Sequence, residues 1–140
     1  MEKIKVAHLV KSEDLNHHGT LFAGRMAEWF VETCFICGAK TTQKPENIVC
    51  ANIHGLSFNA PGNRGDIINM EALVAKAGRS SFTVYGKVTK NNSDYILCDG
   101  FITFVFVDEN GKAIPHNMVL DEPANEEEIK IREKAKNLNR

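Results

Sequence analysis

The stretch LNHHGTLFAGRMAEWFVE, residues 15–32, combines residue types that the rest of the chain keeps apart. It holds Asn16, two histidines, two glycines, two glutamates and the only tryptophan of the chain. Its first half is polar, whereas its second half begins an apolar segment that has neither proline nor alternation. This composition predicts a long buried helix that is entered through a polar loop, with glycines giving access to its backbone.

The helix is predicted over residues 24–40. Apolar residues recur there at helical spacing: Met26, Phe30, Cys34 and Cys37, in a stripe widened by Ala27, Val31 and Phe35. A helix that is apolar over most of its circumference should be buried. Gly38 and the polar residues 41–47 are expected to end it. Cys34 and Cys37 form a CxxC pair, but no second pair follows at zinc-site spacing, so both are predicted to be core thiols.

Strands are predicted on both sides of this helix. Residues 3–10 precede it, and residues 47–58, 67–77, 82–89 and 95–107 follow it. These segments are apolar or alternating, and turns rich in Gly, Asn and Pro separate the later ones. Consecutive strands joined by such short connections are expected to be antiparallel. One long helix and one antiparallel sheet predict an α+β fold in which the sheet wraps around the helix.

The last segment, about residues 124–138, is predicted to be a surface helix. Asn125 and Glu128 fit a capping box, and acidic residues come before basic ones. Ile131, Ala135 and Leu138 make a thin apolar stripe. The chain has no repeat, and its 140 residues suit a single domain spanning residues 1–140.

The composition excludes several classes of function. Seventeen basic and 18 acidic residues give a net charge of −1, so the chain has no basic excess for binding nucleic acid. No apolar run reaches the length that a membrane span needs. The first residues lack the apolar core of a secretion signal, so the four cysteines are expected to be reduced thiols in a cytoplasmic protein.

Four motifs in order resemble one family. Asn16, Gly19, Phe22, Ala23 and Gly24 resemble the pattern N-x-x-G-x-x-F-G-G that precedes the central helix of hot-dog acyl-CoA thioesterases. Three later motifs also match: Phe58, Pro61, Gly65 and Asp66; then Gly78 to Ser81; then residues 107–112 after the last strand. Each motif alone is weak, but four at the right separations indicate a hot-dog thioesterase over nearly the whole chain.

The resemblance implies hydrolysis of an acyl-CoA thioester to a free acid and CoA. Backbone N–H groups at Ala23 and Gly24 would polarise the thioester carbonyl, because the first turn of a helix has unpaired donors and a positive dipole end. Asn16 would hold or orient water or the carbonyl. The resemblance implies no metal or organic cofactor, with coenzyme A entering as part of the substrate.

The general base is the main departure from the family. The family places Asp or Glu seven residues after the second glycine, where this chain has Val31. At about 100° per residue, Glu28 lies about 60° from the usual direction and Glu32 about 100° from it, but Glu32 is closer along the axis. Glu32 is therefore the first choice as the base, and Glu28 is the near-equal alternative.

The resemblance also implies a CoA-binding turn and an oligomer. Gly78, Arg79, Ser80 and Ser81 would lie along CoA, with Arg79 suited to a phosphate and Arg64 as a possible helper. Two protomers would pair their sheets edge to edge, so that Asn16 of one faces the acid of the other. A homodimer or a larger assembly, such as a trimer of dimers, is expected.

Structural explanations compete with these roles. Asn16 could only cap a turn, Glu28 and Glu32 could be solvated or pair with Arg25, and Gly24 could serve close packing. With Val31 at the acid position, the protein could also bind acyl-CoA or an acyl carrier without hydrolysing it. Dehydration or hydration of an acyl chain would need a His–Asp or His–Glu pair that the histidines do not match. The length of the acyl chain is not encoded in these motifs.

Overall fold

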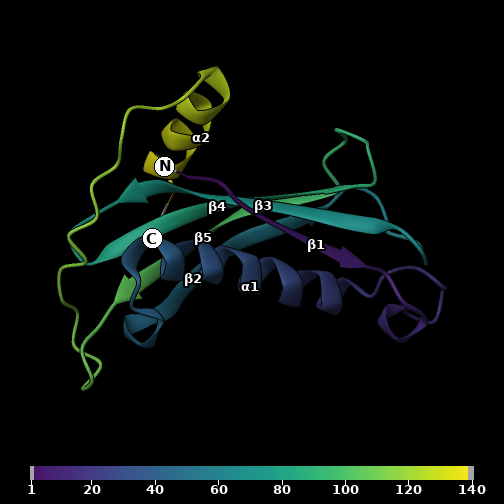
Figure 1. Ribbon diagram of the computed structural model, residues 1–140, viewed down its shortest axis with the longest axis horizontal. Helices are drawn as coiled ribbons and strands as arrows, with labels where there is room; N and C mark the ends of the chain where they lie inside the picture. Colours follow the sequence, from purple (N-terminus) through teal and green to yellow (C-terminus); the bar gives the residue numbers. More distant parts are fainter. Residues whose placement is uncertain (1, 139–140) are drawn as a thin grey trace.

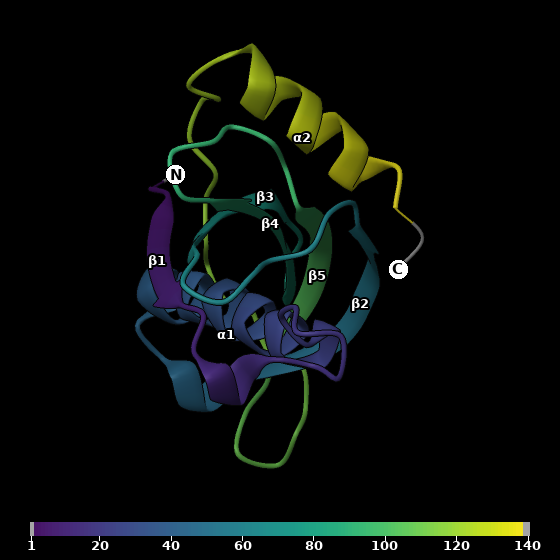
Figure 2. The same ribbon diagram turned by 90° about the vertical axis from the view of Figure 1, so that its right-hand side faces the viewer.

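The computed structural model describes residues 2–138 and contains five strands in one antiparallel sheet. The strands are β1 (Ile4–Leu9), β2 (Ile48–Phe58), β3 (Ile67–Ala77), β4 (Ser81–Lys90) and β5 (Cys98–Phe106), in the spatial order β1-β3-β4-β5-β2. The long helix α1 (Ala23–Thr42) lies against one face of the sheet, and α2 (Glu126–Lys136) lies on the other (Figure 1). Figure 2 shows the sheet curving around α1, which confirms the predicted α+β arrangement.

β2 and β3 follow one another in the chain but do not pair in the sheet. The short connection between them had predicted an antiparallel pair. β2 pairs with β5 at one edge of the sheet, while β3 lies between β1 and β4. β5 is paired on both edges, with β4 and with β2, and its face toward α1 is apolar, with Ile102 and Phe104 at most 1% exposed. The connecting residues 59–66 therefore cross the amino end of α1, where Gly62 accepts a hydrogen bond from the N–H of Leu21.

The core lies between α1 and the sheet. The side chains that face α1 alternate along β3 and β4, as predicted: Ile68, Met70, Ala72 and Val74 on β3, and Phe82, Val84 and Val88 on β4, while β5 adds Ile102 and Phe104. Phe30 of α1 enters this layer at Gly86. A Cβ atom at Gly86 would lie 2.6 Å from the Phe30 ring and 2.9 Å from the sulfur of Cys34, so the missing side chain makes room for the helix.

Helix α1 differs from the prediction at its end and in its exposure. It continues through Gly38 to Thr42 and ends where Gln43 adopts a left-handed conformation. Gly38 is instead a packing residue, because a Cβ atom there would lie 2.7 Å from the ring of Phe82. The helix is also not buried all round: Glu28 and Glu32 are exposed and Val31 is half-buried, on the side that faces the edge strand β2.

The remaining elements agree with the sequence apart from their bounds. α2 spans Glu126–Lys136 rather than residues 124–138, and β5 is shorter than residues 95–107. The side chain of Asn125 accepts the predicted capping bond from the N–H of Glu128. Cys34 and Cys37 are core thiols, as predicted, and burial raises the pKa of Cys37 to about 12.

Asp66 of the Gly-Asp motif fastens the loop that crosses the amino end of α1. Its carboxylate accepts hydrogen bonds from the N–H of Asn63 (2.8 Å) and the side-chain amide of Asn91 (3.1 Å), and it pairs with Lys90 (3.3 Å). Burial alone would raise the pKa of Asp66, but these hydrogen bonds and Lys90 outweigh it and lower the pKa. The ionised form is therefore the one that stabilises the loop.

Replacing Asp66 by asparagine should lower the free energy of unfolding by about 1 kcal/mol at pH 7, since charge-assisted hydrogen bonds are lost. The pKa of Asp66 is lower in the folded protein than its unfolded value of about 4, so the carboxylate stabilises the folded state at pH values above 4. This contribution is lost as the pH falls through the folded-state pKa. Urea unfolding at several pH values should therefore show the two proteins converging below about pH 4. A difference that stays constant down to pH 3 would contradict this role.

Candidate functional site

The amino end of α1 has no side-chain cap. Phe22 occupies the N-cap position without a side-chain hydrogen bond, and its carbonyl accepts from the N–H groups of Arg25 and Met26. Within the described residues, the N–H groups of Ala23 and Gly24 have no acceptor, and both residues are exposed. Two unpaired donors at the positive end of a helix can stabilise an oxygen that gains negative charge.

An apolar pocket of about 300 Å³ opens beside this helix end. It is lined by Leu21, Ala23 and Met26, by Phe58 at the end of β2 and by residues 59–61 of the crossing loop. Phe58 and Pro61 come from the second motif, so the fold brings the first two motifs together. A Cβ atom at Gly24 would lie 2.6 Å from the Phe22 ring, but this ring is 55% exposed and can turn away, so the contact does not require glycine.

Asn16 organises the loop before the helix. Its side-chain oxygen accepts from the N–H groups of His18 (2.9 Å) and Thr20 (3.1 Å), and its amide nitrogen donates to the Thr20 hydroxyl (3.0 Å). The two backbone donors determine which end of the amide is oxygen. The turn-capping role is therefore present, and the second hydrogen of the Asn16 amide has no acceptor among the described residues. Asn16 can offer a substrate a donor, but its acceptor is occupied.

Two ion pairs that share Arg25 connect this loop with α1. Asp14 is 3% exposed, accepts from the N–H of Lys11 and pairs with Arg25 at 3.4 Å. Arg25 also pairs with Glu28 at 3.6 Å. Glu32, one turn further along, makes no ion pair in the described part of the chain. No feature of the sequence singled out Asp14, because an acidic residue in a polar loop is ordinarily exposed.

An open apolar groove follows the exposed side of α1 toward β2. It has a volume of about 580 Å³ and is lined by Ala27, Glu28, Val31, Glu32, Phe35, Cys50 and Phe104. Val31 therefore lies in the groove between the two candidate carboxylates. Cys50 and Phe104 were missing from the predicted site, because they lie on strands and meet α1 only in the folded chain.

The predicted residues lie at two ends of the protomer (Figure 1). Asn16, Ala23, Gly24 and the loop carrying Arg64 share one end. Glu32 is about 14 Å along the helix axis from Ala23, at 1.5 Å per residue. The turn of residues 78–81 lies at the other end. Phe82, next to this turn on β4, packs on Gly38, which is about 22 Å from Ala23 along the helix. One protomer therefore does not assemble all the predicted residues.

The turn formed by Gly78, Arg79, Ser80 and Ser81 presents free donors. The N–H groups of Arg79 and Ser80 have no protein acceptor, and the exposed Arg79 side chain makes no ion pair, within residues 2–138. A Cβ atom at Gly78 would lie 2.9 Å from the Ser81 hydroxyl, so glycine keeps the turn tight. Adjacent N–H groups beside an arginine are suited to binding phosphate.

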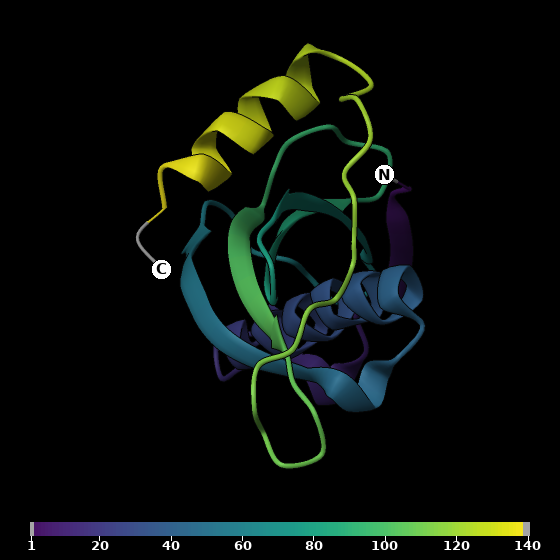
Figure 3. The ribbon, with the colours of Figure 1, turned by 90° about the vertical axis from the view of Figure 1, so that its left-hand side faces the viewer.

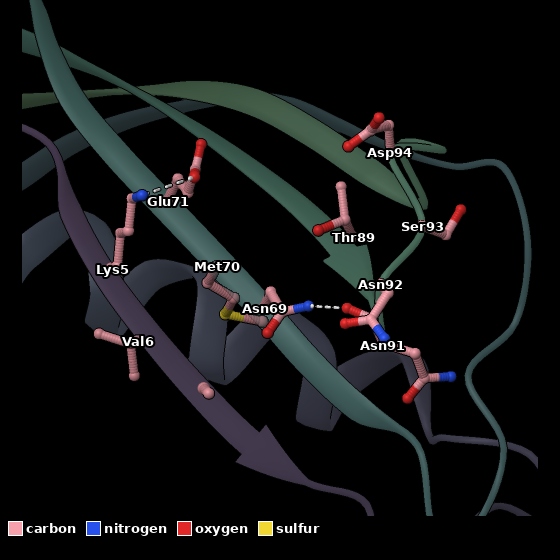
Figure 4. Close-up of a pocket in the computed structure, with 11 residues that line it drawn as sticks. Lys5, Val6, Asn69, Met70, Glu71, Thr89, Asn91, Asn92, Ser93 and Asp94 are labelled. Carbon is pink, nitrogen blue, oxygen red and sulfur yellow. Dashed lines mark hydrogen bonds and ion pairs between the residues drawn. The ribbon is translucent and has the colours of Figure 1, made fainter.

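Another hollow lies on the face of the sheet away from α1 (Figure 4). It measures about 400 Å³ and is lined by amides and paired charges, including Asn69, which donates to the carbonyl of Asn91 at 2.8 Å. It contains none of the predicted site residues. Across residues 2–138 no group of three or more His, Cys, Asp or Glu could hold a metal ion, and no helix is long and apolar enough to span a bilayer.

The fold and the site together define a class of protein. A five-stranded antiparallel sheet of this order, wrapped on one long helix, is the hot-dog fold that the four motifs indicated. A family model described as "Thioesterase superfamily" matches residues 18–96, and the chain belongs to that family of thioester-hydrolysing enzymes.

Similar proteins agree with this assignment. The chain is 31% identical over 122 residues to the Bacillus subtilis protein named "Uncharacterized acyl-CoA thioester hydrolase YkhA", covering 84% of this chain and 69% of that one. A crystal structure of an apo-hexameric acyl-CoA thioesterase has a TM-score of 0.86 at 31% identity, over 96% of this chain and 86% of that one. The Staphylococcus aureus acyl-CoA hydrolase in complex with butyryl-CoA, CoA and CoA disulfide has a TM-score of 0.84 at 27% identity, over 96% and 79%.

Proposed function

We propose that this protein hydrolyses acyl-CoA to a free acid and CoA. The observation that carries the proposal is the uncapped start of α1, where the N–H groups of Ala23 and Gly24 are unpaired beside an apolar pocket. The names of the B. subtilis and S. aureus relatives support acyl-CoA as the substrate class. No metal or organic cofactor takes part, and coenzyme A belongs to the substrate.

The proposed reaction is a direct attack of water. The carbonyl oxygen of the thioester accepts hydrogen bonds from the N–H groups of Ala23 and Gly24, and the free amide hydrogen of Asn16 donates to the water or the carbonyl. A glutamate takes a proton from the water as it attacks the carbonyl carbon. The tetrahedral intermediate then breaks its C–S bond, and the CoA thiolate receives the proton. The groove near Phe35 receives the acyl chain.

Glu32 is the preferred base. Glu28 is engaged by Arg25 at 3.6 Å, whereas Glu32 has no ion-pair partner in the described residues and lies on the same groove. Its carboxylate is therefore free to accept a proton from water. Glu28 remains the alternative, since an exposed ion pair of this length is weak.

The site is completed by a second protomer. About 14 Å along α1 separates Ala23 from Glu32, which one water molecule cannot span. β2 is a free edge strand with Val49 and Ile53 each 46% exposed, so we propose that two sheets pair there. A two-fold axis near the level of Ala27 would reverse α1 and bring Glu32 of the partner subunit to the helix start. The partner's turn with Arg79 would lie at the same end and bind the CoA phosphates.

Larger assembly and location follow as finer proposals. A trimer of such dimers agrees with the hexameric state of one relative. Arg64, exposed in the crossing loop near the helix start, would assist with a phosphate. Four free cysteines suit the reducing cytoplasm. A second candidate function, acyl-CoA binding without hydrolysis, is favoured by one observation, namely Val31 in the groove where the family has an acid.

An asparagine-to-aspartate change tests the proposed donor. Asn16→Asp keeps the oxygen that accepts from His18 and Thr20, so the loop should fold, but it removes the amide hydrogen. We expect kcat for CoA release to fall about 10²-fold, as for loss of one donor to an oxyanion. Asn16→Ala serves as the variant that loses both functions. Full activity of Asn16→Asp would assign Asn16 to the turn alone.

Mixing two inactive variants tests the shared site. Asn16→Asp and Glu32→Gln each disable every site, whereas a dimer containing one of each has one intact site. After subunit exchange the mixture should recover about a quarter of the wild-type rate, because half of the dimers are mixed and each has one native site. Exchange without recovery would place the whole site in one protomer. Tight CoA binding with no turnover by the wild type on any acyl chain would establish the binding function instead.

A further inference from the structure

We propose that His116 is a positioning residue for the CoA-binding turn. It holds the backbone of the Gly78–Ser81 turn in the conformation that leaves the N–H groups of Arg79 and Ser80 free for phosphate. This inference rests on the proposed function, which assigns that turn to the CoA phosphates. His116 itself would not touch the substrate.

His116 belongs to an irregular segment that joins β5 to α2. The segment, residues 107–125, runs along one end of the sheet beside the start of β4 (Figure 3). Its half-buried residues alternate with exposed ones: Ile114, His116, Met118 and Leu120 face inward. Their apolar members pack against the core, so the segment is fixed where it passes the turn.

Three successive carbonyl groups of the turn are held from outside it. The N–H of His116 donates to the carbonyl of Arg79 (3.2 Å), and the N–H of Phe106 donates to that of Ser80 (2.7 Å). The carbonyl of Ser81 accepts from Nε2 of His116 at 2.9 Å and also, within the turn, from the N–H of Gly78 at 2.8 Å. With these acceptors occupied, the donors of Arg79 and Ser80 remain unpaired, which is the arrangement an anion requires.

The two ring nitrogens of His116 have separate tasks. Nδ1 accepts from the N–H of Met118 at 2.9 Å, so the proton of the neutral ring is on Nε2 and is donated to Ser81. The ring also packs edge-on against Phe82, with centroids 5.8 Å apart. Nδ1 therefore shapes the segment that carries His116, while Nε2 holds the turn.

Three substitutions separate these tasks. In His116→Asn the side-chain oxygen can still accept from the N–H of Met118, as asparagine does in turns, but the side chain is too short to reach the Ser81 carbonyl. His116→Gln places an amide donor near the position of Nε2 and loses the bond to Met118. His116→Phe keeps the contact with Phe82 and loses both bonds. Arg79→Ala removes the proposed phosphate contact without changing His116.

The measurements are KM and kcat for an acyl-CoA and for the same acyl group on pantetheine, which lacks the nucleotide. For acyl-CoA we expect KM to rise about tenfold in His116→Asn and His116→Phe, with kcat nearly unchanged, because uniform binding is lost. His116→Gln should remain near the wild type. With the pantetheine substrate all three should match the wild type.

The outcomes distinguish this inference from the proposed function. If Arg79→Ala raises KM for acyl-CoA but His116→Asn does not, the positioning role is wrong. If Arg79→Ala leaves KM unchanged, the turn does not bind the nucleotide, and that part of the proposed function fails. Melting temperatures provide the remaining test. His116→Asn and His116→Gln each lose one hydrogen bond of the ring and should lose similar stability. If KM rises in both variants in proportion to their loss of stability, His116 has only a structural role.

Discussion

Glu32→Gln is expected to lower kcat for acyl-CoA hydrolysis by about 10²- to 10⁴-fold, the usual contribution of a general base. Glutamine keeps the size and exposure of the side chain, so the groove and the fold should be unchanged. KM should change little, because the carboxylate acts on water rather than on the acyl-CoA. The rate is measured as release of the CoA thiol, with a correction for Cys50, the one exposed cysteine in the described chain.

Glu28→Gln is the matched control, one helical turn away on the same groove. It removes the ion pair with Arg25, which is exposed and weak, and should retain most of the activity. The reverse pattern, with Glu28→Gln inactive and Glu32→Gln active, would make Glu28 the base. Full activity in both variants would mean that neither glutamate takes the proton, and the proposed mechanism would fail.

Phe30→Ala is expected to cost about 3–5 kcal/mol of stability, the usual loss when a buried phenylalanine is truncated. The Phe30 side chain is 1% exposed and fills the space above Gly86. Its removal leaves a cavity between α1 and the middle of the sheet, where neither element can move inward without breaking ladder hydrogen bonds. Urea unfolding gives the free energy for comparison with the wild type.

Gly86→Ala tests the same contact from the other side. In the wild type the new methyl group would meet the Phe30 ring at 2.6 Å, so a loss of about 1–3 kcal/mol is expected from overpacking. In the Phe30→Ala background the methyl group no longer meets the ring, so its cost should fall, although the sulfur of Cys34 at 2.9 Å still has to shift. A double-mutant cycle in which the two losses simply add would show that Phe30 and Gly86 do not pack as described.

Predictions that depended on local pattern agree with the structure. The alternation of Ile68, Met70, Ala72 and Val74 predicted the buried face of β3, because side chains of a strand point to opposite faces in turn. The spacing of Met26, Phe30 and Cys34 predicted the buried face of α1 for the same kind of reason. Both patterns arise from the backbone geometry of a single segment.

Predictions that depended on distant neighbours were less complete. In the sequence Gly38 looks like the end of the helix. In the structure the helix continues, and glycine is required there because the ring of Phe82 on β4 leaves no room for a side chain. β2 comes directly before β3 in the chain and yet pairs with β5, at the other side of the sheet from β3. His116 had no sign of its role, since its partners Ser81 and Arg79 lie more than thirty positions earlier.

The candidate site divides in the same way. The order of the motifs was sufficient to indicate the hot-dog fold, the thioesterase family and an exposed helix start at Ala23 and Gly24, because these features are properties of short continuous segments. Only the folded chain decided that Glu28 is occupied by Arg25 while Glu32 is free, and that the turn at Arg79 lies at the opposite end from Asn16. Those relations are distances between segments far apart in sequence, and packing of α1 against the sheet determines them.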